Sequence, residues 1–238
     1  MKSPTELASL TNPSTFAQMA ALRRETNSKR SSKQPGGNGA GRLPAAPSAS
    51  SRSSPEWQEL YFRWLSGATS LPRDANGNAV AGRVALIALP NTPGDGTRGH
   101  LDVTLSAAQS WVLPLRTVIG SSYSDGTPPD QFLPDAMFEN LQISFEIGRE
   151  TVVSRANVMD YYSRVVFAPP IPFETSTVSA LIWMQVIGLV HGPLEAGIHK
   201  MKLDVKDTQP MPPNFGSGLV EFHNTWSVKV LAEGSKRK

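Results

Sequence analysis

The sequence predicts an all-β protein, an antiparallel β-sandwich of which the jelly roll is one form, with a disordered basic N-terminal arm. Three observations predict it. Apolar residues after Trp57 recur with a period of two, clusters of Gly, Pro, Asn and Asp separate these stretches, and large apolar residues are scarce before Trp57. The sequence therefore divides into a basic arm over 1–55, a β-sandwich domain over 56–232 and a basic tail over 233–238.

The arm carries most of the positive charge of the chain. Residues 1–55 hold eight basic and two acidic side chains, so the remaining 15 basic and 18 acidic side chains leave residues 56–238 at a formal −3. The basic side chains that we expect to contact nucleic acid are Arg23, Arg24, Lys29, Arg30 and Lys33. Flexible basic segments bind phosphate without sequence specificity through counterion release, so RNA or another polyanion is the predicted partner of the arm. A solubilising linker is the alternative.

Alternation places the strands along the chain. Leu60, Phe62 and Trp64 alternate with polar or smaller neighbours, which predicts a first strand. The same pattern predicts strands over 101–105, 141–147, 201–205 and 220–230, each with one exposed face. Segments 84–89, 111–115 and 180–190 are apolar on both faces, which is typical of covered strands, and Pro114 indicates an edge or a bulge in one of them. A tight hairpin is expected at residues 148–149, and short helices near 134–139 and 156–161.

The sequence carries no familiar enzyme signature. It lacks cysteine, which excludes disulfide scaffolds, Cys nucleophiles and iron–sulfur clusters, and the spacing of its four His residues fits no compact metal motif. The candidate ligand-binding residues are Tyr123, Asp125, Asp130, His191 and His199. A hairpin between His191 and His199 would bring both imidazoles to the loop end that carries Tyr123 and Asp125. A site of two His and one carboxylate and a solvated polar loop both remain open there, and no cofactor is predicted.

The location of the protein stays undetermined by the sequence. No apolar stretch approaches the roughly 20 residues of a membrane-spanning helix, and no secretory signal is evident. The N-terminus is basic, rich in Ser and poor in acidic residues, as organelle transit peptides are. A cleaved arm and a permanent one are therefore both compatible with the sequence.

The body resembles an uncharacterised family of β-sandwich proteins from bacteria and fungi. The shared elements are an apolar strand with a Tyr–x–Asp–Gly loop, a Tyr-rich turn followed by Phe and Pro, a Gly–x–His strand opening and a late Asn–x–Trp strand. In this chain they lie at 113–115 with 123–130, at 161–162 with 167–172, at 197–199 and at 224–226. The resemblance implies a sandwich fold and no established activity.

A second resemblance is architectural, because a basic arm before a β-sandwich is the layout of small icosahedral plant-virus coat proteins. The sequence thus predicts a non-enzymatic protein that works by binding or self-assembly. Two alternatives remain: a capsid-type protein whose arm contacts packaged RNA, and a secreted hydrolase or metal-dependent enzyme at the loop end.

Overall fold

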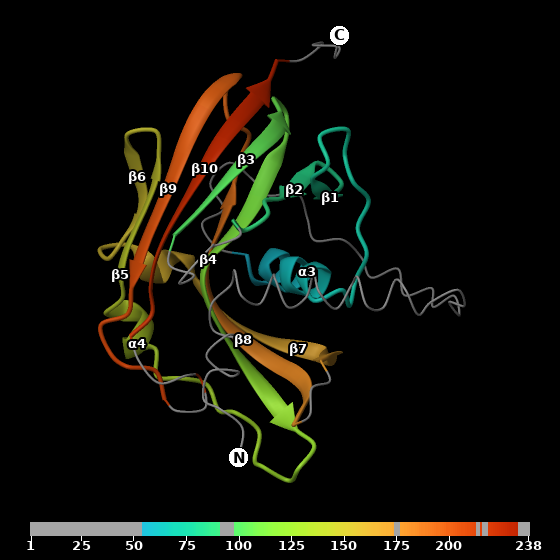
Figure 1. Ribbon diagram of the computed structural model, residues 1–238, viewed down its shortest axis with the longest axis vertical. Coiled ribbons are helices and arrows are strands. Elements are labelled where there is room, and N and C mark those ends of the chain that lie inside the picture. The colour runs from blue at the N-terminus through green and yellow to red at the C-terminus, as the bar shows by residue number, and fades with distance from the viewer. Residues whose placement is uncertain (1–53, 91–97, 174–176, 213–214, 216–218, 233–238) are drawn as a thin grey trace, which may run out of the picture.

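A computed structural model describes residues 54–90, 98–173, 177–212, 215 and 219–232. Within them the protein is mostly β, with two sheets of five strands each (Figure 1). The predicted arm, apart from Ser54 and Pro55, and the predicted tail lie outside the described residues. None of the helices in the described part is long and apolar enough to cross a membrane.

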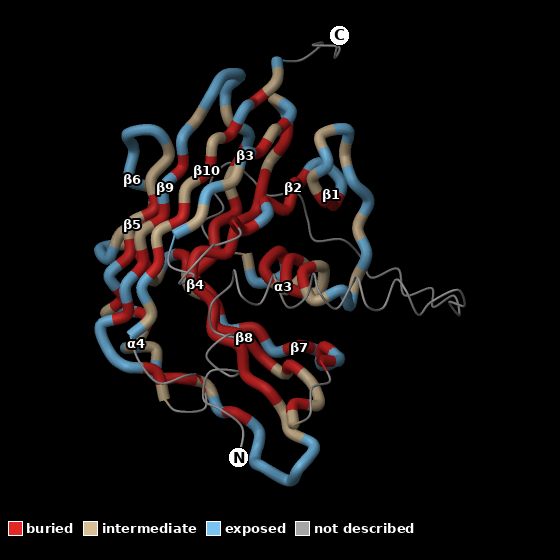
Figure 2. The backbone as a smooth tube through the Cα atoms, in the orientation of Figure 1, coloured by how far each residue is buried: buried red, intermediate tan, exposed pale blue. Residues whose placement is uncertain are grey.

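Sheet A contains the two longest strands, β4 and β8, at its centre. Both are 14 residues long and buried along most of their length, as their apolar character on both faces predicts (Figure 2). The register shifts between Pro114 and Arg116, so the bulge expected at Pro114 is confirmed. In spatial order the strands are β1 (Ala79–Ala81), β2 (Val84–Leu86), β4 (Ser110–Tyr123), β8 (Val178–His191) and β7 (Tyr162–Pro172).

Sheet B contains most of the strands predicted from alternation. Their burial alternates along the chain, so one face is packed and the other is exposed to solvent. The hairpin expected at Gly148 and Arg149 joins its last two strands, and Gly148 has the positive φ of 64° that such a turn favours. In spatial order the strands are β3 (Arg98–Ser106), β10 (Glu221–Leu231), β9 (Gly197–Lys206), β5 (Gln142–Ile147) and β6 (Glu150–Ser154).

The short helices lie where the sequence predicts them, but the pairing and the first element differ. Helix α4 spans Ala136–Glu139 and the 3-10 helix η1 spans Val158–Tyr161. The expectation of purely antiparallel sheets is wrong, because β3 runs parallel to β10 and β2 runs parallel to β4. Both sheets are therefore mixed.

The strand predicted at Leu60, Phe62 and Trp64 is wrong, since these residues belong to helix α3 (Pro55–Leu65). Pro55 occupies the first turn, where a helix loses no hydrogen bond to proline. Four large apolar side chains have the spacing of one helix face, and their burial favours the helix over a strand. The buried stripe consists of Trp57, Tyr61, Phe62 and Leu65.

Two apolar clusters explain why sheet A is buried on both faces. The first joins residues of both sheets, such as Leu113 and Ile187 of sheet A with Phe145 and Trp226 of sheet B. The second joins α3 to the opposite face of sheet A, and the Tyr61 hydroxyl donates a 2.7 Å hydrogen bond to the Ile87 carbonyl there. Figure 1 shows α3 beside the middle of sheet A. The face of sheet B that points away from sheet A is therefore a large polar surface of the described protein.

Candidate functional site

The structure brings two of the five predicted ligand-binding residues together. The Tyr123 hydroxyl lies 3.0 Å from each carboxylate oxygen of Asp130, and the Ser121 amide donates a 2.9 Å hydrogen bond to the same group. The Trp183 indole donates to the Asp130 carbonyl at 2.8 Å. Burial, and then the charge of Asp130, raise the pKa of Tyr123 above its ordinary value. These contacts occupy both side chains, so the pair holds its loop against sheet A.

Asp125 lies beyond this pair in the exposed part of the same loop. Its carboxylate accepts a 3.0 Å hydrogen bond from the Thr127 amide, which lowers the pKa of Asp125. This is the local turn contact that Asp makes in loops.

The predicted common rim for all five residues is wrong. In the pairing of β4 with β8, His191 lies opposite Trp111 and Tyr123 lies opposite Val178, at the other end of the pair. At about 3.3 Å per residue, the two ends of a 14-residue strand lie about 40 Å apart. The predicted hairpin is also wrong, because β8 belongs to sheet A whereas β9 belongs to sheet B.

The two imidazoles have local partners. The His191 ring stacks on Trp111, with centroids 4.9 Å apart, and its Nδ1 lies 2.7 Å from the Gly192 carbonyl. The Nε2 of His199 lies 2.8 Å from the Glu195 carbonyl. No group of three or more His, Asp or Glu side chains suited to a metal ion occurs among the described residues. The geometry expected for a two-His-one-carboxylate site is therefore not assembled.

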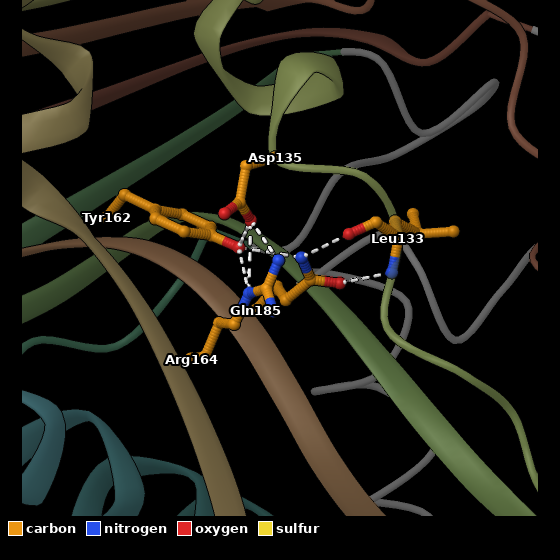
Figure 3. Close-up of polar contacts among 5 residues, drawn as sticks. All are labelled: Leu133, Asp135, Tyr162, Arg164 and Gln185. Atoms are coloured by element: carbon orange, nitrogen blue, oxygen red, sulfur yellow. Dashed lines mark hydrogen bonds and ion pairs between the residues drawn. The ribbon is translucent and has the colours of Figure 1, made fainter.

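A polar network on sheet A escaped the sequence analysis (Figure 3). The Tyr162 hydroxyl donates to Asp135 and accepts hydrogen bonds from Gln185 at 2.7 Å and from Arg164 at 3.2 Å. The Gln185 amide also exchanges two hydrogen bonds with the Leu133 backbone, at 2.8 and 3.0 Å. Each of these groups has a partner, so the network fastens the segment before α4 to β7 and β8.

The ion pair in this network controls the acidity of its carboxyl group. Partial desolvation raises the pKa of Asp135, but the hydrogen bonds from Tyr162 and Arg164 and the Arg164 charge outweigh it and hold the pKa below its ordinary value. Burial, followed by the hydrogen bond to Asp135, raises the pKa of Tyr162. At neutral pH the network thus holds a carboxylate and a neutral phenol.

The outer face of sheet B gathers polar side chains from four strands into rows. One row across the sheet runs Arg98, His223, Asp204 and Ser144, each directly opposite the next. The neighbouring row runs His100, Thr225, Lys202 and Glu146. Residues directly opposite each other in a sheet are within side-chain reach, so these two rows form one surface.

Short contacts connect the side chains of this surface. The Nδ1 of His223 lies 2.6 Å from an Asp204 oxygen, and the Lys202 ammonium lies 2.6 Å from the other oxygen. Desolvation raises the pKa of Asp204, but the hydrogen bonds from Lys202 and His223 outweigh it and the pKa is lowered. The Lys206 ammonium pairs with Glu221 at 3.0 Å. Asp204 is therefore a carboxylate held between two donors at neutral pH.

Two adjoining hollows open on this face and share Asp204 and His223. The wider hollow has a volume of about 670 Å³ and the second has a volume of about 420 Å³. The wider hollow is lined by Arg98, Gly99, His100, Lys202, Asp204, His223 and Thr225. Among its lining side chains two cations face one carboxylate, while the carboxylate of Asp102 lies 3.3 Å from His100 and that of Glu221 lies 3.5 Å from His223.

A hydroxyl, an imidazole and a carboxylate meet beside this hollow. The Thr225 hydroxyl lies 2.8 Å from Nδ1 of His100, and Nε2 of His100 lies 3.3 Å from Asp102. The side chains of His100 and Asp102 are 54% and 84% exposed, so water screens the charges that would activate a nucleophile. The Thr225 hydroxyl is also within 3.3 Å of the Gly99 carbonyl, to which it donates. The imidazole and the carboxylate of this group are therefore open to solvent.

No family model matches the chain, and no curated protein is significantly similar to it. Among solved structures, the Plasmodium falciparum protein Pf12p is aligned with 64% of this chain and 49% of its own length, at 6% identity and a TM-score of 0.22. The alignment thus spans about half the length of that protein, and the resemblance to an uncharacterised family stays a prediction.

Proposed function

We propose that the protein is a non-enzymatic binding protein, on a fold that we interpret as a β-sandwich, and that it recognises an anionic ligand through the outer face of sheet B. The observation that carries this proposal is the wider hollow, in which Arg98, Lys202 and two imidazoles surround a single carboxylate. Ligand-binding surfaces are concave and present a few converging polar groups, and this hollow does both.

The charges of the hollow favour an anion. The Lys202 ammonium already pairs with Asp204. None of the ion pairs among the described residues includes Arg98. A guanidinium binds phosphate or carboxylate through two parallel hydrogen bonds, and an anion there would supply the missing partner.

A capsid-type protein is the second candidate, because the arm concentrates positive charge ahead of an acidic body. In that case Arg23, Arg24, Lys29, Arg30 and Lys33 would neutralise the phosphates of packaged RNA, and the fold would be a jelly roll. The third candidate, an enzyme at the loop end, required Tyr123 and His191 at one rim, but these two residues lie at opposite ends of the β4–β8 pair. We do not retain it.

The binding proposal is tested with a labelled single-stranded RNA homopolymer as the anionic probe, by fluorescence anisotropy on the full chain over a salt series. Loss of two charge-assisted contacts in R98Q/K202Q is expected to lower affinity by about tenfold or more. The matched control is Lys229→Gln, which removes an exposed Lys from β10 outside the hollow and is expected to change affinity less than about twofold.

A second variant separates the two candidates. Replacing the five arm residues Arg23, Arg24, Lys29, Arg30 and Lys33 by Gln removes the arm contacts and leaves the hollow intact. Unchanged affinity in R98Q/K202Q together with loss in the arm variant would refute the role of the hollow and favour the capsid-type candidate. Loss in R98Q/K202Q alone supports the hollow.

A further inference from the structure

We propose that two copies of this chain associate through the free edge of β3, which pairs antiparallel with its counterpart about a two-fold axis at His100. This inference goes beyond ligand binding and does not require it, but the two proposals share one residue, since Arg98 also lines the wider hollow. The charge pattern of β3 is the main reason for this proposal. The pairing places Arg98 of each copy opposite Asp102 of the other.

The described sheets have four edge strands, and β3 is the best suited to pairing. Strand β1 has three residues and β6 has five, with a register irregularity beside it. Strand β7 carries Pro169, Pro170 and Pro172, and its pairing is interrupted between Val166 and Ile171. Strand β3 has nine residues and no proline. Proteins protect edge strands with shortness, proline, bulges and charged side chains. Of these, β3 has only the charged side chains, among them Arg98 and Asp102.

The contacts of β3 show which of its backbone groups face the free edge. The Thr225 hydroxyl of β10 donates to the Gly99 carbonyl, so Gly99 points toward β10. The Asn78 amide donates to the Thr104 carbonyl at 2.7 Å from outside the sheet, so Thr104 points away from β10. Because backbone groups alternate along a strand, Arg98, His100 and Asp102 also point away from it.

Asn78 also fixes where the free stretch ends. It occupies the Thr104 carbonyl, which leaves residues 98–102 for a partner. The outward side chains of this stretch are accessible: Arg98, His100 and Asp102 are exposed, whereas Thr104 is partly buried. No backbone hydrogen bond outside the sheet ladders is present for Arg98, His100 or Asp102 among the described residues.

The side chains select one register and one partner. Centring the pair on His100 sets Arg98 opposite Asp102 twice, and opposite charges directly across a strand pair are favourable. Centring it on Asp102 would set two carboxylates against each other. Centring it on Leu101 would require the Thr104 carbonyl that Asn78 occupies. The stretch is therefore self-complementary, as a two-fold interface between identical subunits requires.

Association through five residues of strand is expected to be weak. Such an interface lies at the low end of specific contacts, where complexes are transient. The resulting assembly would join two copies of sheet B edge to edge, with their outer faces on the same side. A dissociation constant in the micromolar to millimolar range is therefore expected.

Sedimentation velocity on the full chain, over a wide concentration series, tests the proposal. The wild type is expected to pass from monomer to dimer. Asp102→Arg and Arg98→Asp each turn two attractive pairs into repulsive ones and should raise the dissociation constant about tenfold or more. The charge-exchanged R98D/D102R chain restores both pairs in reversed order and should recover the dimer. Lys229→Glu, a charge reversal elsewhere on the face of sheet B, is the control and should leave it unchanged.

Each outcome decides the question. A monomeric wild type at all concentrations, dimerisation of D102R at the wild-type level, or a thermally stable R98D/D102R chain that stays monomeric would each overturn the proposal. Hydrogen exchange tests whether another segment of the chain already covers the edge of β3. Protection of the His100 and Asp102 amides in dilute monomer would show that it does and would overturn the proposal. Lys202→Gln weakens only the proposed anion site and should leave the dimer intact. The dimer proposal can therefore fail or hold independently of the anion-binding proposal.

Discussion

Replacing Asp207 by Asn should destabilise the protein severely, because it leaves a buried guanidinium without its counterion. Arg116 donates to both Asp207 oxygens, at 3.2 and 2.8 Å, and the two side chains are 2% and 7% exposed. Breaking such a pair from one side costs about 3–5 kcal/mol of unfolding free energy. Arg116 keeps its 2.7 Å hydrogen bond to the Thr117 carbonyl. We therefore expect a loss of about 3 kcal/mol in unfolding free energy, or roughly 6–12 °C in Tm.

Urea unfolding of the full chain at neutral pH, followed by fluorescence of the buried tryptophans, measures this loss. Glu221→Gln is the control, because its pair with Lys206 is about half exposed on both sides and should contribute less than about 1 kcal/mol. The double variant R116M/D207L removes both charges and should be more stable than D207N, since no unpaired charge remains. A loss below about 1 kcal/mol in D207N, or a double variant no better than it, would refute the reasoning.

Three further outcomes are expected from unfolding experiments. Gln58→Met should stabilise the protein by about 1–2 kcal/mol, because both polar atoms of this fully buried amide lack a partner in the described structure; a loss of stability would contradict this. Gly188→Ala should destabilise by about 1–3 kcal/mol, since its Cβ would lie 2.3 Å from the Gln58 amide, and G188A combined with Q58A should recover part of the loss. The lowered pKa of Asp135 means that its ionised form stabilises the fold above the ordinary value of 3.8 and that this contribution disappears as pH falls through the lowered pKa; unfolding between pH 2 and 6 should therefore show a weaker acid dependence in D135N than in wild type.

The strands that alternate cleanly were predictable because alternation reports the environment of a residue directly. Phe145 and Leu203 are buried while their neighbours are exposed or partly so, as their pattern predicts. The strand predicted at residues 60–64 was wrong because a short alternating pattern is ambiguous. Once Trp57, Tyr61 and Leu65 are included, the apolar residues follow the spacing of one helix face. A longer window and Pro55 would have favoured the helix.

Topology explains the failures at the candidate site. The local sequence of residues 191–199 does not indicate that the chain leaves sheet A after His191 and enters sheet B at Gly197. The closeness of His100 and His223 was not predicted, because they are 123 positions apart in the sequence and become neighbours only through the parallel pairing of β3 with β10. The alternation of Lys202 and Asp204 with buried residues was the available signal, but it marks an exposed face without saying which strands share it.

The place of β10 has a consequence for the order of synthesis. This strand is the last among the described residues, yet it lies between β3 and β9 in the interior of sheet B, and the Trp226 indole donates to the Ala88 carbonyl across 138 residues. At about 5–20 residues per second, on the order of 10 s pass between the synthesis of β3 and that of β10, its one partner strand in the described sheet. During that time both edges of β3 are available to other chains. Nascent chains stalled before residue 221 should therefore be the form of this protein most in need of a chaperone.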